Sequence, residues 1–152
     1  MANLIIDTQL LLLFVVGMTK RSYITKHKRL HAYSEADFDL LKEEIAPYDA
    51  IVVTPNTLTE TSNLLGYIQE PMRSEVFAVF GAFIRHVDER YVESRALCGD
   101  RAFMTLGLTD AALLEISRDH DILLTADLGL YLAGAKNGAV NFNHIREARG
   151  TI

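Results

Sequence analysis

Short apolar runs alternate along this chain with longer stretches in which apolar residues recur at helical spacing. The runs at residues 4–6, 50–53, 122–124 and 139–142 predict strands, and residues 90–93 predict a further strand at an edge. Apolar positions three or four residues apart predict helices over 8–18, 34–46, 57–68, 71–87, 96–106 and 109–116, with a short helix after Asp127. Strands that alternate with helices indicate an α/β fold, here a three-layer α/β/α sandwich around a mostly parallel sheet.

Polar residues mark several of the predicted helix starts. Two pairs have the spacing of a capping box, Ser34 with Asp37 and Thr57 with Glu60. Thr109 is placed to cap the helix that opens with Asp110. Residues 144–149 predict a polar tail.

Length and composition narrow the class of protein. A chain of 152 residues, 49% of them hydrophobic, predicts a single domain over residues 1–152 with a substantial core. The formal net charge of −5 gives no whole-molecule attraction to nucleic acid. One cysteine, Cys98, suits a reducing compartment, and the apolar run at residues 10–18 is far shorter than the roughly 20 residues of a membrane span. We therefore expect a cytoplasmic protein that does not contact membranes.

Acidic residues follow the predicted strands or open the predicted helices. Asp7 and Asp127 come just after strands, and Glu60 and Asp110 lie near helix starts. Open parallel sheets bind ligands at the carboxyl ends of their strands, and Mg²⁺ and Mn²⁺ prefer oxygen ligands. The chain has no glycine-rich phosphate loop, no nucleophile elbow and no zinc-ligand spacing of its histidines.

Each acid also has a purely structural interpretation. Glu60 can complete the capping box with Thr57, and Asp110 and Asp127 can favour the positive ends of helix dipoles. Asp7 is different because it interrupts an apolar stretch, where an unpaired carboxylate is costly. Convergence of the four acids in space would favour a metal site over the structural interpretation.

Four segments together resemble the motifs of PIN-domain nucleases. They are LIIDTQLLLL with Asp7, TPNTLTETSNLL with Glu60, GLTDAALLEIS with Asp110 and LLTADLGLY with Asp127. They occur in the family's order and cover nearly the whole chain. Gln9 departs from the pattern, in which Asn is commoner after Asp-Thr. The resemblance implies the sheet order 3-2-1-4-5, Mg²⁺ or Mn²⁺ as cofactor, and single-stranded RNA as substrate.

The resemblance also implies roles for single residues. Asp7, Glu60, Asp110 and Asp127 would hold the metal, while Thr125, Thr8 and Asn63 would orient ligands or water. The expected function is a metal-dependent endoribonuclease that cleaves single-stranded RNA by one-metal or two-metal phosphodiester hydrolysis. Many family members are toxins of toxin–antitoxin pairs, so an antitoxin protein is an expected partner, and a homodimer stays open.

Two other functions stay open at this point. One is a catalytically silent α/β module that binds protein or RNA, and the other is a small metal-dependent phosphohydrolase. The chain also has a basic segment, residues 20–31, which is not a family signature. Its five cations are candidates for RNA phosphate contacts, although a solvated loop explains them equally well: Lys20, Arg21, Lys26, Lys28 and Arg29.

Overall fold

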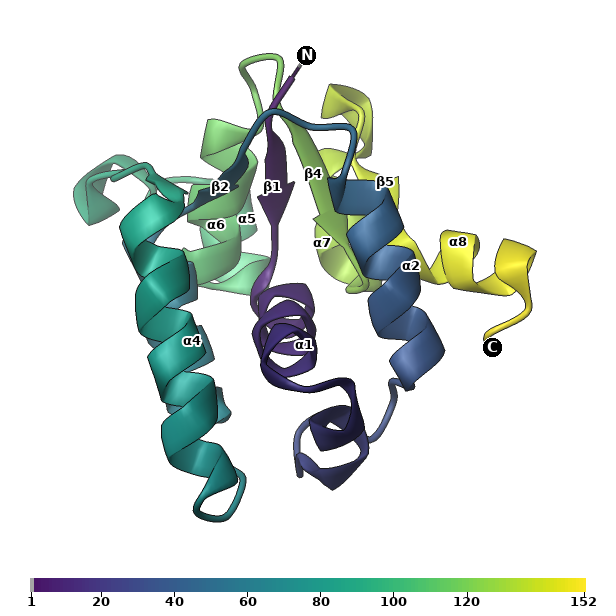
Figure 1. The fold of residues 1–152 in the computed structure, drawn as a ribbon. Coiled ribbons are helices and arrows are strands. Elements are labelled where there is room, and N and C mark those ends of the chain that lie inside the picture. The colour runs from purple at the N-terminus through teal and green to yellow at the C-terminus, as the bar shows by residue number, and fades with distance from the viewer. Residues whose placement is uncertain (1) are drawn as a thin grey trace.

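The computed structural model describes residues 2–152 and contains a five-stranded, all-parallel sheet. Its strands are β1 (Leu4–Ile6), β2 (Ile51–Val53), β3 (Asp88–Glu89), β4 (Ile122–Thr125) and β5 (Val140–Asn141). They lie in the order β3-β2-β1-β4-β5, with β1 at the centre (Figure 1). This confirms the predicted α/β class and the order 3-2-1-4-5.

Helices cover both faces of the sheet. They are α1 (Thr8–Thr19), α2 (Glu35–Ile45), α3 (Pro55–Leu65), α4 (Met72–His86), α5 (Arg101–Leu106), α6 (Leu108–Ile116), α7 (Leu128–Gly134) and α8 (Phe142–Arg149). Three short 3₁₀ helices, Arg21–Lys26, Ser94–Ala96 and Ala135–Asn137, lie between them. In Figure 1, α1, α2 and α4 lie in front of the sheet and α5, α6 and α7 lie behind it.

The central strand shows how the two layers are built. Leu4 and Ile6 point into the core formed with α1 to α4, whereas Ile5 points into the core formed with α6 and α7. All three side chains are buried, because a parallel sheet with helices on both faces leaves no solvated side. The apolar run of α1 is buried almost all round, and Gly17 lets that helix approach Phe38 of α2 closely.

The capping box at the start of α2 is confirmed. The Ser34 hydroxyl accepts a hydrogen bond from the Asp37 backbone N–H, and the Asp37 carboxylate accepts one from the Ser34 N–H at 2.8 Å. Asp37 also pairs with Arg146 at 3.0 Å, and both side chains are buried. The predicted polar tail over residues 144–149 is therefore wrong: these residues belong to α8, which packs through Phe142 and carries Arg146 into the core.

Two other predicted caps are wrong. Thr54, not Thr57, caps α3, because Pro55 occupies the first helical position and has no N–H to satisfy. Thr109 does not cap α6, which begins at Leu108 after Gly107. Gly107 has φ +91°, a conformation that glycine adopts without strain, and its N–H closes the end of α5.

The segment between α4 and α6 also differs from the prediction. The edge strand is Asp88–Glu89 and not residues 90–93. Its partner β2 ends at Val53, whose carbonyl accepts the Arg90 N–H, so the residues after Arg90 have no strand to pair with. The Arg90 side chain instead forms ion pairs with Asp88 and Asp121. The prediction of a continuous helix over 96–106 is likewise wrong. Turns surround the buried Leu97, and α5 begins only at Arg101.

The basic segment is ordered rather than a solvated loop. It holds the 3₁₀ helix Arg21–Lys26, and its inward-facing residues are buried: Tyr23, Ile24, His27 and Leu30. The cations of the segment lie on its outer side. None of the helices within residues 2–152 combines the length and the apolar character needed to cross a membrane.

Candidate functional site

The carboxyl edge of the sheet brings distant acids together. β1 and β4 pair with Ile6 beside Leu124, so the residues that follow them, Asp7 and Thr125, become neighbours although they are far apart in sequence. The N-terminal ends of α1 and α7 start at this same edge. This carboxyl edge is the part of the sheet at which the sequence predicts a ligand site.

Asp7 is buried and fixed through both carboxylate oxygens. Its Oδ1 accepts a hydrogen bond from the Leu10 N–H at 3.0 Å, which caps α1, and its Oδ2 accepts one from the Thr125 hydroxyl. Burial raises the pKa of Asp7, although the hydrogen bonds from Thr125 and Leu10 oppose that effect. Thr125 thus orients this carboxylate, as the sequence suggested.

Glu60 is exposed on α3 and held by two threonines from other helices. Its Oε1 accepts a hydrogen bond from the Thr8 hydroxyl at 3.4 Å, and its Oε2 accepts one from the Thr109 hydroxyl. Thr8 opens α1 and Thr109 lies in the first turn of α6, so Glu60 links three helices. Thr109 was expected to cap a helix, and only its position directly before Asp110 pointed to the site.

Asp110 is half-buried in the first turn of α6, among the other acids. Burial and the negative charges of Asp127, Asp7 and Glu60 raise its pKa to about 6. Within residues 2–152 its carboxylate takes part in no hydrogen bond and no ion pair. Among the described residues, Asp110 is therefore the acid of this group whose charge is influenced by the three others and offset by no partner.

Asp127 is exposed and completes the group. Its Oδ1 accepts a hydrogen bond from the Leu130 N–H at 2.9 Å and caps α7, while its own N–H donates to the Thr125 hydroxyl oxygen at 2.9 Å. The Thr125 hydroxyl thus donates to Asp7 and accepts from Asp127. Asp127 therefore caps a helix and also contributes its negative charge to the group of acids around Asp110.

The residues predicted for the site are not all brought together. Asn63 is exposed, and within residues 2–152 no side-chain hydrogen bond joins it to the acids. The predicted RNA contacts Lys20 and Arg29 lie beyond the far end of α1, which is about 18 Å long at 1.5 Å per residue.

The donor set suits a hard cation, although the side chains are not arranged around one. In the part of the chain that the structure describes, no three His, Cys, Asp or Glu side chains approach closely enough to hold a metal ion. No Lys, Arg or His there forms an ion pair with any of the four acids. Carboxylate oxygens left free by capping, above all those of Asp110, are the ligands that Mg²⁺ and Mn²⁺ prefer.

Sequence reasoning missed the residues that support this edge from α8. The Asn143 side-chain amide donates to the Ala126 carbonyl at 3.1 Å, and the Arg146 guanidinium donates to the Asn143 oxygen at 2.9 Å. The Arg146 guanidinium lies over the Tyr33 ring, 4.7 Å from the ring centre. Burial together with the charge of Asp7 raises the pKa of Tyr33 to about 12. The three-residue spacing of Phe142 and Ile145 is the signal that could have revealed this helix.

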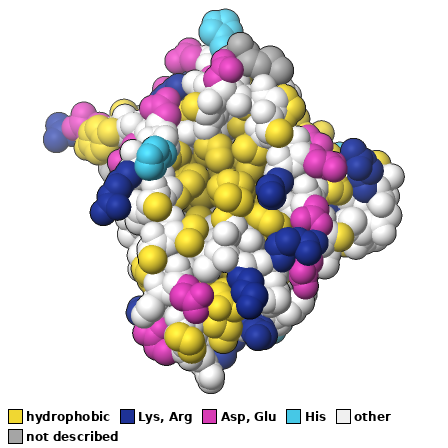
Figure 2. Space-filling view, viewed as in Figure 1, with side chains coloured by type: hydrophobic (Ala, Val, Ile, Leu, Met, Phe, Trp, Pro, Cys, Tyr) yellow, Lys and Arg dark blue, Asp and Glu magenta, His cyan; other side chains and the backbone are white. Residues whose placement is uncertain are grey.

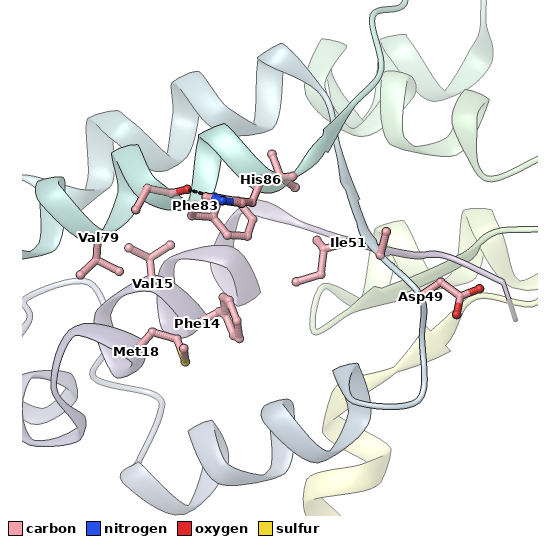
Figure 3. Close-up of a pocket in the computed structure, with 11 residues that line it drawn as sticks. Phe14, Val15, Met18, Asp49, Ile51, Val79, Phe83 and His86 are labelled. Carbon is pink, nitrogen blue, oxygen red and sulfur yellow. Dashed lines mark hydrogen bonds between the residues drawn. The ribbon is translucent and has the colours of Figure 1, made fainter.

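A large apolar cavity lies away from the acids. Its volume is about 440 Å³, and it is lined by Phe14 and Met18 of α1, Ile51 of β2 and Val79 and Phe83 of α4 (Figure 3). Figure 2 shows it as an apolar hollow at the centre of the face that carries α4, α1 and α2. Because it faces the start of β2 rather than its carboxyl end, it is separate from the acidic edge.

Comparison with known proteins gives no relative: no family model, no curated protein and no solved structure matches this chain.

Proposed function

We propose that this chain is a metal-dependent endoribonuclease of the PIN type that cleaves single-stranded RNA. The observation that carries the proposal is the convergence of Asp7, Glu60, Asp110 and Asp127 at the carboxyl edge of a parallel sheet, where no cation within residues 2–152 is paired to them. Two acids could serve as caps alone, but four that repel one another cost stability unless they bind something positive. The motif resemblance and the sheet order 3-2-1-4-5 support the same family.

In this proposal the four carboxylates would hold Mg²⁺ or Mn²⁺. When bound, such an ion would supply activation of water and compensation of the negative charge on the phosphodiester. Thr125 keeps Asp7 in one orientation, and Thr8 and Thr109 do the same for Glu60. Within residues 2–152 the Asp110 carboxylate accepts no such hydrogen bond, so it could turn toward a bound cation.

The test is cleavage of end-labelled single-stranded RNA by purified protein with Mn²⁺ or Mg²⁺ and with EDTA. Asp7→Asn is the matched variant, because asparagine is as good a helix cap as aspartate but a poorer ligand for a hard cation. We expect cleavage by wild type, none in EDTA, and loss of most activity in Asp7→Asn purified in parallel. Equal rates in the two proteins would point to a contaminating nuclease and sink the assignment.

The same assay separates the alternatives. Hydrolysis of a generic phosphomonoester without RNA cleavage would indicate a small phosphohydrolase. RNA binding without any hydrolysis would indicate a silent module.

We place the proposed activity in the cytoplasm, where the single Cys98 suits the reducing conditions. An antitoxin remains part of the proposal, and its test is whether the product of a neighbouring reading frame suppresses toxicity of the expressed chain. A homodimer is tested by sedimentation.

A further inference from the structure

The basic segment after α1 is fastened to the end of α3 by its backbone and by a buried histidine. The His27 ring hydrogen-bonds the Leu65 carbonyl through Nε2 at 3.1 Å, and its Nδ1 accepts the Arg29 N–H at 3.1 Å. The Lys28 N–H donates to the Tyr67 carbonyl at 3.2 Å. His27 itself is fully buried. These contacts hold residues 27–29 in one position against residues 65–67.

An exposed cation lies over an exposed ring at this junction, and further exposed cations belong to residues next to it. The Arg29 guanidinium lies 4.2 Å from the centre of the Tyr67 ring, and Tyr67 is 43% exposed. Arg73 of α4 reaches the same place, with its Nε 3.4 Å from where a Cβ on Gly66 would lie. We call Lys28, Arg29, Tyr67 and Arg73 the Tyr67 surface.

The cations of the Tyr67 surface form no ion pair with the acids of the described residues, although Glu70 lies near Arg73. Within residues 2–152, Lys28, Arg29 and Arg73 form no ion pair, whereas Arg21 of the same segment pairs with Glu35 and Asp39. The carboxylate of Glu70 feels the charge of Arg73, but it accepts its hydrogen bonds from Ser74. Arg29 lies over Tyr67, Lys28 precedes Arg29 in the sequence, and Arg73 lies beside Gly66 with its guanidinium 4.7 Å from the centre of the Phe77 ring. In a chain of net charge −5, three cations without ion pairs at this junction form a local anion-attracting site.

The Tyr67 surface lies just past the C-terminal end of α3, the helix that carries Glu60. Glu60 is five residues before the end of that helix at Leu65, about 8 Å along the axis at 1.5 Å per residue, and Tyr67 follows two residues after Leu65. The exposed Asn63 lies between Glu60 and Tyr67 in the sequence. A single strand with a 3.4 Å spacing needs roughly two to three nucleotides to cover those 8 Å.

We propose that the Tyr67 surface holds the single strand of RNA that runs from the acidic edge along α3. Arg29 and Arg73 bind its phosphates, and one unpaired base stacks on the exposed Tyr67 and Arg29 pair, as in other single-strand binders. The position of the strand relative to cleavage rests on the proposed function, whereas binding itself does not. A double-stranded RNA has no free base to offer the ring, and an acidic peptide has no base at all.

The experiment measures binding of a labelled twelve-nucleotide single-stranded RNA by fluorescence anisotropy in EDTA, over a range of salt concentrations. Arg29→Gln with Arg73→Gln should weaken binding at least tenfold and reduce the slope of log affinity against log salt by about 1.4, which is two contacts at about 0.7 each. The matched control is Arg85→Gln with Lys136→Gln, which removes the same charge from exposed positions elsewhere. It should leave the slope unchanged.

The ring is tested separately. Tyr67→Ala should weaken single-strand binding roughly five-fold or more, the range found for one stacked base, while Tyr67→Phe keeps the affinity. Equal losses in the control pair, no effect of Tyr67→Ala, equal affinity for duplex RNA or for polyglutamate, or no binding by wild type would each overturn the proposal. Melting curves establish that each variant is folded.

Cleavage in Mn²⁺ distinguishes failure here from failure of the nuclease. If the chain cleaves RNA, the Tyr67→Ala variant should raise KM and leave kcat unchanged, because the contact is made equally before and during cleavage. Variant-sensitive binding without cleavage would reject the nuclease and retain the Tyr67 surface. Cleavage with unaltered KM in all variants would retain the nuclease and reject the Tyr67 surface.

Discussion

Replacing Asp110 by asparagine should make the metal-free protein more stable. The change removes one of four mutually repelling charges from the carboxyl edge of the sheet and keeps the side-chain shape. A carboxyl pKa raised from 3.8 to about 6 corresponds to at most about 3 kcal/mol of destabilisation at neutral pH. Half-exposure to water and the remaining cost of burying an amide reduce the expected gain to about 1–2 kcal/mol. For a domain of this size that gain is a rise of about 2–8 °C in Tm.

The pH dependence has a definite sign. Because the folded-state pKa of Asp110 lies above its unfolded value, its destabilising effect is complete above pH 6 and disappears as the pH falls toward 4. The advantage of Asp110→Asn over wild type should therefore shrink between pH 7 and pH 4. Asp119→Asn is the control, since Asp119 is an exposed aspartate whose side chain forms no hydrogen bond or ion pair within residues 2–152.

Metal should act in the opposite direction. Mn²⁺ at one hundred times its Kd would stabilise wild type by about 2.7 kcal/mol, and Asp110→Asn should gain much less. The assay is a set of melting curves for wild type, Asp110→Asn and Asp119→Asn, each with EDTA and with Mn²⁺. If Asp110→Asn melts below wild type in EDTA and all three proteins respond equally to Mn²⁺, Asp110 is a helix-start residue and the acids do not form a metal site.

Three further predictions concern the fold. Asp37→Ala should lower the free energy of unfolding, measured in urea, by about 3–5 kcal/mol, because it leaves the buried Arg146 guanidinium without its carboxylate. A decrease below about 1 kcal/mol would contradict this prediction. Burial lowers the pKa of His27, so the stability that neutral His27 contributes is present above pH 6.5 and lost as the pH falls below it. The stability difference between wild type and His27→Gln should accordingly shrink from pH 7.5 to pH 5.5, and a constant difference would refute the assignment. Gly17→Ala should lower Tm, because its methyl would lie 2.2 Å from the Phe38 ring, whereas Gly81→Ala, with nothing within 4 Å, should raise it slightly.

The layer architecture was predictable because local patterns and tertiary packing agree. The apolar runs of β1, β2 and β4 are buried on both faces, so their sequences carry a strong signal. At the edges that agreement ends. Tyr91 and Val92 have the composition of a strand, yet β2 stops at Val53 because Pro55 starts a helix there, and no partner backbone remains. Strand position at an edge depends on the neighbouring chain and not on local propensity.

The sequence was enough to predict which acids form the candidate site. It was not enough to predict which other residues contact those acids. Asp7 and Asp127 follow strands in the sequence, which was enough to place them at one edge. The support of Glu60 by Thr109 spans 49 residues, and the approach of Tyr33 to Asp7 depends on the position of α2. Such contacts have no periodicity in the sequence, so only the folded arrangement reveals them.

The pairing of β1 with β4 has a consequence for the order in which the molecule is assembled during synthesis. Asp7 and Thr125 are 118 residues apart, and the central strand has its full set of neighbours only when β4 has been made. At about 5–20 residues per second, a ribosome needs roughly 6–24 s to synthesise the intervening chain. During that interval β2 and α3, which carries Glu60, can already pack beside β1 and Asp7. Asp110 and Asp127 are not yet in place. A nascent chain therefore passes most of its synthesis without the acidic edge, which forms as one of the last events of folding.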